Sequence, residues 1–409
     1  MADLNGIFDS AVRNSIFQNK EIIQSNYIPE AIPHRDKQIE QIASIMAPVL
    51  RGEKCSNLFV YGKTGTGKTL SIQHISTELK KKAKEIGADV RIEYINCKLK
   101  KVADTEYRIL AALIELLGEQ VAETGLPTVQ VYNKFLNLID TKKQIVVIIF
   151  DEIDQVVQKI GTDFIYSLIR LNSELSKAQI SLIGISNDVT FLDDIDPRVK
   201  SSLSEEEIVF PPYNALQLQD ILNTRTKMAF KKESIEKGVI EKCAAFAARE
   251  HGDARRALDL LRVAGELAER EGKTKVDLSY IDKANQKIER DKILDIVETG
   301  TRQFQLILHS IVQLTKRVEK EKVKNKEIDR FYTGDVYNLY QEVCKETRTE
   351  PLTQRRVSDI ISELDMLGLI RFDVISKGRH GRTREIALVI SGNLIDKVEK
   401  ILKDSLGVD

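Results

Sequence analysis

The segment Gly-Lys-Thr-Gly-Thr-Gly-Lys-Thr, residues 62–69, constrains the fold more than any other part of the chain. A short apolar run at residues 57–61 precedes it and a helical pattern at residues 70–82 follows it. This is the strand, loop and helix that a phosphate-binding loop requires. Its three glycines leave room for backbone N–H groups to close around phosphate oxygens at a helix N-terminus. The sequence therefore predicts a nucleoside triphosphate as ligand, in preference to a glycine-rich turn that only opens a helix.

The side chains of this loop have separate predicted roles. Lys68 reaches the outer phosphates, and Thr69 offers its hydroxyl to Mg²⁺. We expect ATP or ADP to be held by Gly62, Lys63, Thr64, Gly65, Thr66, Gly67, Lys68, Thr69 and Leu70.

Composition restricts the class of protein. With 409 residues the chain has room for two or three domains, and its 62 basic and 62 acidic residues cancel, so no overall charge draws it to nucleic acid or membrane. The cysteines are too far apart for a zinc site or a dense disulfide framework: Cys55, Cys97, Cys243 and Cys344. The sequence has neither a signal-peptide core nor an apolar run long enough to span a membrane. We expect a soluble cytoplasmic protein without a membrane partner.

Short apolar runs alternate with helical patterns up to about residue 212; the runs are residues 58–61, 90–96, 145–150, 180–186 and 207–210. This alternation predicts a parallel sheet with helices on both faces, which gives an α/β nucleotide-binding base over residues 1–212. After Pro211 and Pro212 the strand pattern stops and helical spacing begins. We expect an all-α domain over residues 213–298.

Residues 299–409 predict a third domain. Helical patterns cover residues 301–322, 335–344 and 354–367. Two predicted strands follow, at residues 369–375 and 385–390. Three helices and a β-hairpin form a winged helix. The third helix has Thr353 as its expected N-cap, and its expected buried face is Val357, Ile360, Ile361, Leu364 and Leu367.

This winged helix has polar and basic side chains where it could contact DNA. The outward positions at the start of the third helix are Gln354, Arg355, Arg356 and Ser358. Arginine and glutamine suit the edges of guanine and adenine in a major groove. The hairpin connection contains no acid and carries Lys377, Arg379, His380, Arg382 and Arg384, which favours contact with phosphates. The alternative is a winged helix that binds protein and has a solvated basic turn.

Two carboxylates end the buried strand at residues 145–150. The carboxyl edge of a parallel sheet lies beside the phosphate-binding loop. Asp151 can therefore complete the Mg²⁺ shell with Thr69, and Glu152 can orient or deprotonate the attacking water. Asn187 ends another predicted strand, where its amide could hold that water or the γ-phosphate, although an asparagine there is more often a turn former.

These motifs resemble those of the AAA+ ATPases, with Asp151 and Glu152 as the Walker B motif and Asn187 as sensor one. The segment His-Gly-Asp-Ala-Arg-Arg-Ala-Leu, residues 251–258, looks like the second sensor of the initiator and clamp-loader clade. The resemblance implies that Arg255 points from a helical lid at the phosphates. An arginine on a mobile lid binds strongly only while the γ-phosphate is present, so the lid angle would report the nucleotide state.

The whole chain resembles the archaeal ORC-type replication initiators. Residues 26–36 look like the family's segment near the adenine, and residues 210–225 look like its second nucleotide-contact region, which implies contacts from Tyr213 and Arg225. The stretch from Lys98 into the following helix resembles an insertion that touches DNA. The resemblance implies duplex origin DNA, the replicative helicase and a second initiator subunit as partners, in the nucleoid.

The sequence departs from many AAA+ relatives at the position that supplies an arginine finger to a neighbouring subunit. Ser202 stands there, with Arg198 and Lys200 as the nearby cations. An arginine finger is worth about a thousandfold or more in rate. We therefore expect slow ATP hydrolysis that acts as a switch.

Two other functions compete with an ATP-dependent initiator. A signal-transducing ATPase that regulates transcription would use the same winged helix at promoters. A clamp-loader-like subunit would turn over rapidly, and Ser202 and the basic wing both count against it.

Overall fold

The computed structural model describes residues 15–25, 27–98, 104–122, 125–191, 195–322, 331–376, 382–390 and 392–408. Internal contacts divide the chain into two compact units, Met1–Asp282 and Lys283–Asp409. The three domains predicted to meet near residues 212 and 298 stay a prediction. Asn26 and part of the predicted insertion, residues 99–103, lie outside the described residues.

The first unit contains a five-stranded sheet in the order β2-β3-β4-β1-β5. Every neighbouring pair in it is parallel, as the alternation of strands and helices predicts. The strands are β1 Leu58–Tyr61, β2 Val90–Asn96, β3 Ile145–Asp151, β4 Gln179–Ser186 and β5 Glu206–Val209.

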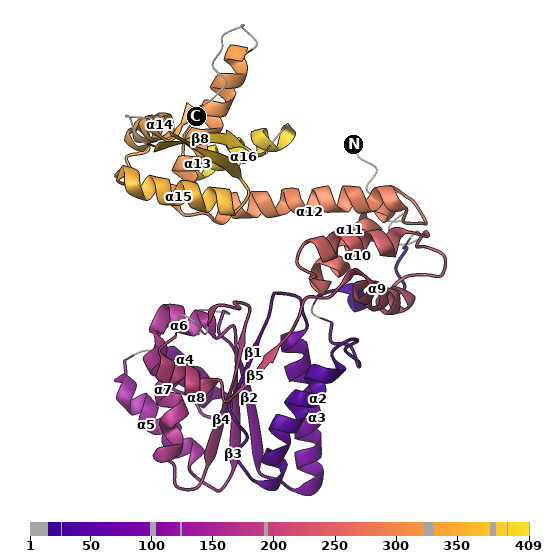
Figure 1. The fold of residues 1–409 in the computed structure, drawn as a ribbon, viewed down its shortest axis with the longest axis vertical. Helices are drawn as coiled ribbons and strands as arrows, with labels where there is room; N and C mark the ends of the chain where they lie inside the picture. The colour runs from indigo at the N-terminus through magenta and orange to yellow at the C-terminus, as the bar shows by residue number, and fades with distance from the viewer. Residues whose placement is uncertain are drawn as a thin grey trace. The chain divides into compact units, whose positions relative to one another are not determined.

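Helices cover both faces of this sheet, and its interior strand β3 is accordingly apolar on both sides. Along β3, Val147 and Ile149 pack into one hydrophobic cluster, and Ile148 and Phe150 pack into another. One face is covered by α2 Asp36–Met46, α3 Lys68–Ile86 and the 3-10 turn Ala47–Arg51. The opposite face is covered by α4 Glu106–Leu116, α5 Thr128–Ile139, α6 Asp154–Ile160, α7 Thr162–Arg170 and α8 Pro197–Leu203 (Figure 1).

Three helices form the lid of the same unit: α9 Ala215–Ala229, α10 Val239–Arg249 and α11 Ala254–Arg270. The N-terminal segment lies on this lid and contains the 3-10 turn Lys20–Ile23. The Phe17 ring packs 4.6 Å from that of Phe230, and Lys20 pairs with Glu266 at 2.9 Å. The chain therefore contacts the lid before it enters the base at α2.

The second unit is a winged helix around one hydrophobic cluster. α12 Leu278–Thr299 leads into it, and α13 Arg302–Lys322, α14 Thr333–Glu346 and α15 Gln354–Met366 form its helices. Its antiparallel sheet has the order β6-β8-β7. The remaining elements are β6 Phe331–Tyr332, β7 Ile370–Ser376, β8 Arg382–Leu388 and α16 Asn393–Leu406.

Some predicted bounds in the winged helix were wrong. β8 begins at Arg382, so Arg382 and Arg384 belong to a strand and not to the hairpin connection, because the pairing with β7 continues to Ser376. Leu367 lies past the end of α15 and is 39% exposed instead of buried. The short β6 and the whole of α16 were missed.

Two further findings bear on the class of protein. All four cysteines are free and buried. Within the described ranges, no helix is both long and apolar enough to cross a bilayer.

A buried histidine lies in the core of the second unit. His309 on α13 is 1% exposed; its Nε2 atom lies 2.8 Å from Gln313 Nε2, and its Nδ1 atom has no hydrogen-bond partner among the described residues. Burial lowers the pKa of His309 below its ordinary value of 6.5, while Glu399 opposes that shift. The folded protein therefore favours the neutral imidazole.

This burial should make the second unit sensitive to acid. Below pH 6.5 the unfolded chain takes up a proton at His309 that the folded chain resists, so the free energy of unfolding should fall as pH drops from 7 to 5. The measurement is hydrogen exchange of the α13 amides, which reports the free energy of unfolding at each pH. In His309→Gln this free energy should change less between pH 7 and pH 5 than in the unaltered chain. His74→Gln on the half-exposed face of α3 is the control. Equal pH dependence in His309→Gln and the unaltered chain would contradict the prediction.

Candidate nucleotide site

The strand order brings the predicted site residues together. β4 lies between β1 and β3, so the ends of these three strands are neighbours at the carboxyl edge of the sheet. β1 leads into the loop at Gly62, β3 ends at Asp151, and Asn187 directly follows β4. Three segments far apart in the sequence therefore meet at one edge.

The glycines of the loop are required by its geometry. Gly62, Gly65 and Gly67 all have positive φ angles, of 153°, 67° and 91°. A Cβ atom on Gly62 would clash with the carbonyl oxygen of Phe210, and one on Gly65 would clash with the carboxylate of Asp253. Side chains at these positions would displace the loop from the strands and from the lid.

Lys68 is buried at the centre of the loop. It is 4% exposed, and its Nζ atom donates to the carbonyl oxygens of Gly62 and Lys63 and to Asn187 Oδ1, each at 2.8 Å. Burial lowers its pKa to about 8, while the charge of Asp151 opposes the shift. The contact with Asn187 joins the loop to β4, so both predicted residues lie in one cluster.

The oxygen atoms that would bind a metal are also together. Thr69 Oγ1 donates to Asp151 Oδ2 at 2.9 Å, and the hydroxyl of Tyr94 donates to the same oxygen at 2.6 Å. A hydroxyl and a carboxylate next to a phosphate site fit Mg²⁺, which keeps several waters and takes few protein ligands. Sequence reasoning missed Tyr94, because its role depends on β2 lying beside β3.

Glu152 has an unusual backbone and a cationic partner. Its φ angle is 55°, in the left-handed region that residues other than glycine rarely adopt. Its carboxylate lies 3.5 Å from Lys98 Nζ, just after β2. At this left-handed turn the Glu152 N–H donates to Oδ1 of the preceding residue, Asp151, at 3.0 Å.

The lid contacts the loop through the start of α11. Asp253 caps this helix, because its Oδ1 atom accepts from the N–H groups of Arg255 and Arg256. Its Oδ2 atom accepts from Thr64 Oγ1 at 3.2 Å, and Ala254 N–H donates to the Gly65 carbonyl. Arg255 is exposed, and its charge acts to lower the pKa of Lys68. The predicted second sensor is therefore near the loop.

A buried arginine connects three parts of this site. Arg35, at the start of α2, is 2% exposed; it donates to the carbonyl oxygens of Thr66 at 2.8 Å, Pro211 at 2.6 Å and His34 at 3.1 Å. Its guanidinium lies 3.8 Å from the ring centroid of Tyr213. These contacts hold the loop against the segment that enters the lid. Sequence reasoning gave Arg35 no role.

The two contacts predicted from residues 210–225 lie in different surroundings. Tyr213 is buried, and its hydroxyl would be 3.0 Å from a Cβ atom on Gly67, so it borders the loop. Arg225 is buried against the N-terminal segment, where its guanidinium lies 4.5 Å from the Tyr27 ring. The role of both residues in nucleotide binding stays a prediction.

The segment predicted to lack an arginine finger lies in α8. The hydroxyl of Ser202 donates to the carbonyl oxygen of Arg198 within the same helix. The Arg198 guanidinium pairs with Asp196 at 2.8 Å. The nearby arginine is therefore engaged by an acid of its own subunit.

In the second unit, α15 presents its predicted outward residues. Thr353 caps the helix by accepting from the Arg356 N–H, as the sequence predicts. Gln354, Arg355 and Arg356 are exposed, and Ser358 is half-buried. The first turn of α15 therefore offers two guanidinium groups and an amide to solvent.

Arg384 joins the wing to this helix. Its Nη1 atom donates to the Ser358 carbonyl at 2.9 Å and to Ser362 Oγ at 2.8 Å, and its guanidinium lies 4.4 Å from the Phe372 ring centroid. Lys377, Arg379 and His380 lie outside the described residues, as does the side chain of Arg382.

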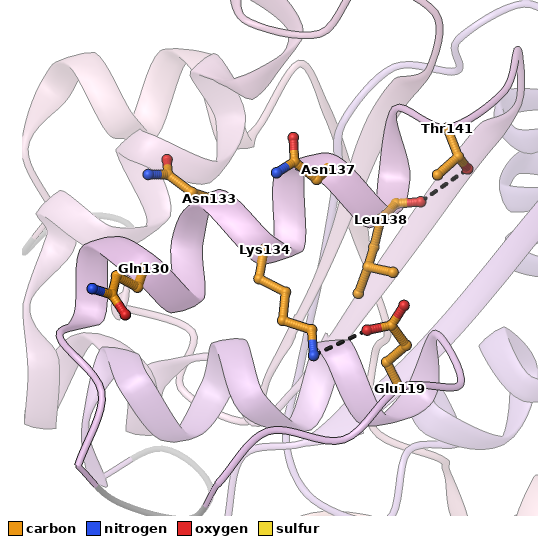
Figure 2. A pocket seen from close by; sticks show the side chains of 7 residues that line it. All are labelled: Glu119, Gln130, Asn133, Lys134, Asn137, Leu138 and Thr141. Carbon is orange, nitrogen blue, oxygen red and sulfur yellow. Dashed lines mark hydrogen bonds and ion pairs between the residues drawn. The ribbon is translucent and has the colours of Figure 1, made fainter.

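A hollow of about 520 Å³ lies on α5 and has none of the predicted site residues in its lining. Amide and hydroxyl side chains line most of it, and its two charged residues, Glu119 and Lys134, pair at 3.0 Å (Figure 2). Its lining therefore offers no buried acid, base or nucleophile.

Three family models match the chain. They are an AAA domain at residues 51–190, a Cdc6 AAA+ ATPase-type lid domain at 219–286, and a CDC6 C-terminal winged helix domain at 295–398. The predicted fold class is thus confirmed.

Relatives match over nearly the full length of the chain. The ORC1-type DNA replication protein of Thermococcus onnurineus (strain NA1) is 50% identical over 393 residues, which cover 95% of this chain and 92% of that protein. ORC1-type DNA replication protein 1 of Methanosarcina mazei is 46% identical over 400 residues, covering 98% and 93%. A solved structure of Aeropyrum pernix ORC1 in complex with DNA is 41% identical, with a TM-score of 0.82, and covers 95% of this chain and 97% of that chain.

Arg35→Lys should destabilise the unit that holds the loop. A single ammonium group cannot reproduce the planar fork that reaches Thr66 and Pro211 together, so a buried carbonyl would lose its donor, at about 2 kcal/mol. The control is Arg51→Lys, an exposed residue paired with Glu53, where less than about 0.5 kcal/mol is expected. Urea midpoints of the nucleotide-free chain measure both, and equal midpoints would contradict the prediction.

Proposed function

The chain belongs to the ORC1-type family of DNA replication proteins, and from that premise we propose that it is an ATP-dependent initiator that binds duplex origin DNA. The observation that carries the proposal is the joint presence of an AAA domain with a phosphate-binding loop and a winged helix, in a chain that is similar to these relatives over nearly its whole length. This similarity favours an initiator over a transcription regulator or a clamp-loader subunit.

The nucleotide would be ATP or ADP with Mg²⁺. The glycine loop would hold the phosphates, Lys68 would neutralise their charge, and Thr69 and Asp151 would take Mg²⁺, which polarises the phosphate oxygens when bound. Tyr94 would fix the Asp151 carboxylate through its 2.6 Å hydrogen bond. Tyr213 borders the loop and would contribute to the same pocket.

Hydrolysis would be slow and would act as a switch. Glu152 would orient or deprotonate the attacking water, and Asn187 would help to place it. Two observations support a low rate: Ser202 stands at the finger position, and Arg198 is paired with Asp196. Arg255 on the lid would respond to the γ-phosphate, so the nucleotide state would alter the contact between lid and base.

DNA would bind to the second unit. The exposed first turn of α15 supports base contacts from Gln354 and Arg355, with Arg356 and Ser358 beside them. The wing would contact phosphates through Lys377, Arg379, His380 and Arg382. Arg384 would act through its contacts with α15 and hold the wing in register.

The partners and location follow from the family. We propose duplex origin DNA as the main partner, with the replicative helicase and a second initiator subunit recruited to it, in the nucleoid of the cytoplasm. The solved ORC1 structure that resembles this chain was determined in complex with DNA, which supports the first of these partners.

Turnover should be below about 1 per second, under the usual range for enzymes. Glu152→Gln should keep ATP binding and lower phosphate release by about a hundredfold or more, because it removes the proposed base. Lys68→Ala should abolish ATP binding. Glu119→Gln, in the hollow on α5, is the matched control and should behave as the unaltered chain. Faster turnover would exclude the switch, and full activity in Glu152→Gln would exclude that residue as the base.

Binding sites mapped across the genome should coincide with the origins seen as peaks of marker frequency. Arg355→Ala should lower occupancy at these sites by roughly tenfold, since loss of one base contact costs about 1–3 kcal/mol. Lys400→Ala removes one positive charge at an exposed position of α16 and should change occupancy little. Chromatin immunoprecipitation measures all three chains. Binding confined to promoters would support a transcription regulator and reject the initiator.

A further inference from the structure

A carboxylate of the lid rests on the phosphate-binding loop. Asp253 Oδ2 accepts from Thr64 Oγ1 at 3.2 Å, and its Oδ1 atom lies so close to Gly65 that a Cβ atom there would clash with it. The adjoining backbone adds a second link, because Ala254 N–H donates to the Gly65 carbonyl at 3.2 Å. A negative charge is thus held against a loop whose geometry suits anions.

The helix does not require this charge. Asp253 caps α11 by accepting from the N–H groups of Arg255 and Arg256. Asparagine caps helices about as well as aspartate, and serine is close to both. A neutral side chain at this position could keep the cap, and asparagine could also accept from Thr64. The charge adds only a small attraction to the helix dipole, so the cap itself does not depend on it.

The charge acts on the same cation as the nucleotide would. Lys68 Nζ is held by the carbonyl oxygens of Gly62 and Lys63, next to Thr64, the residue that Asp253 contacts. The Asp253 carboxylate therefore lies on the same loop as this buried ammonium group, which it attracts and stabilises. Phosphates brought to the loop would supply the same stabilisation and would be repelled by Asp253.

We propose that Asp253 is a positioning residue that competes with the nucleotide phosphates for the loop, and so weakens nucleotide binding and couples it to release of the lid. This inference rests on the proposed ATP site and extends it. Since Asp253 and Arg255 lie at the start of one helix, the movement that relieves repulsion at Asp253 also repositions Arg255. The lid would then carry one group that opposes the phosphates and one that attracts them.

The test measures binding of ATP, ADP and adenosine to the full chain by titration calorimetry. Asp253→Asn should bind ATP about tenfold more tightly, as expected for removal of one like charge a few ångströms away. The gain should be smaller for ADP and absent for adenosine, because it follows the phosphate charge. Asp253→Ser, a second neutral cap, should change affinity in the same direction.

The matched control is Asp277→Asn. Asp277 is another lid carboxylate that accepts from a helix N-terminus, through the Ser279 N–H at 2.7 Å. Its substitution removes the same charge and should leave all three affinities unchanged. An equal gain in Asp277→Asn, an equal gain for adenosine, or unchanged or weaker ATP binding in both Asp253 variants would overturn the inference alone. Failure of the unaltered chain to bind ATP would reject the proposed function, and this inference with it.

Discussion

Burial of one ammonium group organises the nucleotide half of this protein. An unpaired charge in the interior costs several kcal/mol, so Lys68 can be buried only if its donors are met. The loop meets two of them by turning the carbonyl oxygens of Gly62 and Lys63 inward, and Asn187 meets the third from the end of β4. These three contacts hold the loop against the end of β4.

Arg35 applies the same constraint on the other side of the loop. Its guanidinium is buried against three backbone carbonyls and the face of Tyr213. Because Pro211 and Tyr213 lie in the segment that enters the lid, the loop and that segment share one buried cation. The N-terminal segment reaches the lid separately, through Phe17 and Lys20. One buried cation therefore connects the loop of the base to the start of the lid.

The sequence predicted those features that depend on local pattern. The glycine loop, the apolar β3 and the cap at Thr353 each follow from neighbouring residues, and all are found in the structure. The contacts of Tyr94 with Asp151, of Arg35 with Thr66 and of Asp253 with Thr64 were missed because each joins residues more than 30 positions apart. Only the strand order and the lid contact bring these residues together. Arg384 was assigned to the hairpin connection from the sequence, because no local pattern marks the end of the strand pairing there. In the structure the pairing continues to Ser376 and Arg382, so Arg384 lies within β8. Where a side chain acts through distant partners, the sequence alone names the residue type but not the neighbour.

The left-handed backbone of Glu152 lowers the stability of the fold at a residue for which a role in hydrolysis is proposed. A left-handed residue other than glycine costs about 1 kcal/mol or more, and glycine would remove that strain. Selection for stability alone would favour glycine at this position, because glycine adopts a positive φ angle without strain. If Glu152 has the role proposed above, laboratory screens for heat-resistant variants would select glycine at this position and lose the carboxylate, unless the screens also required ATP hydrolysis.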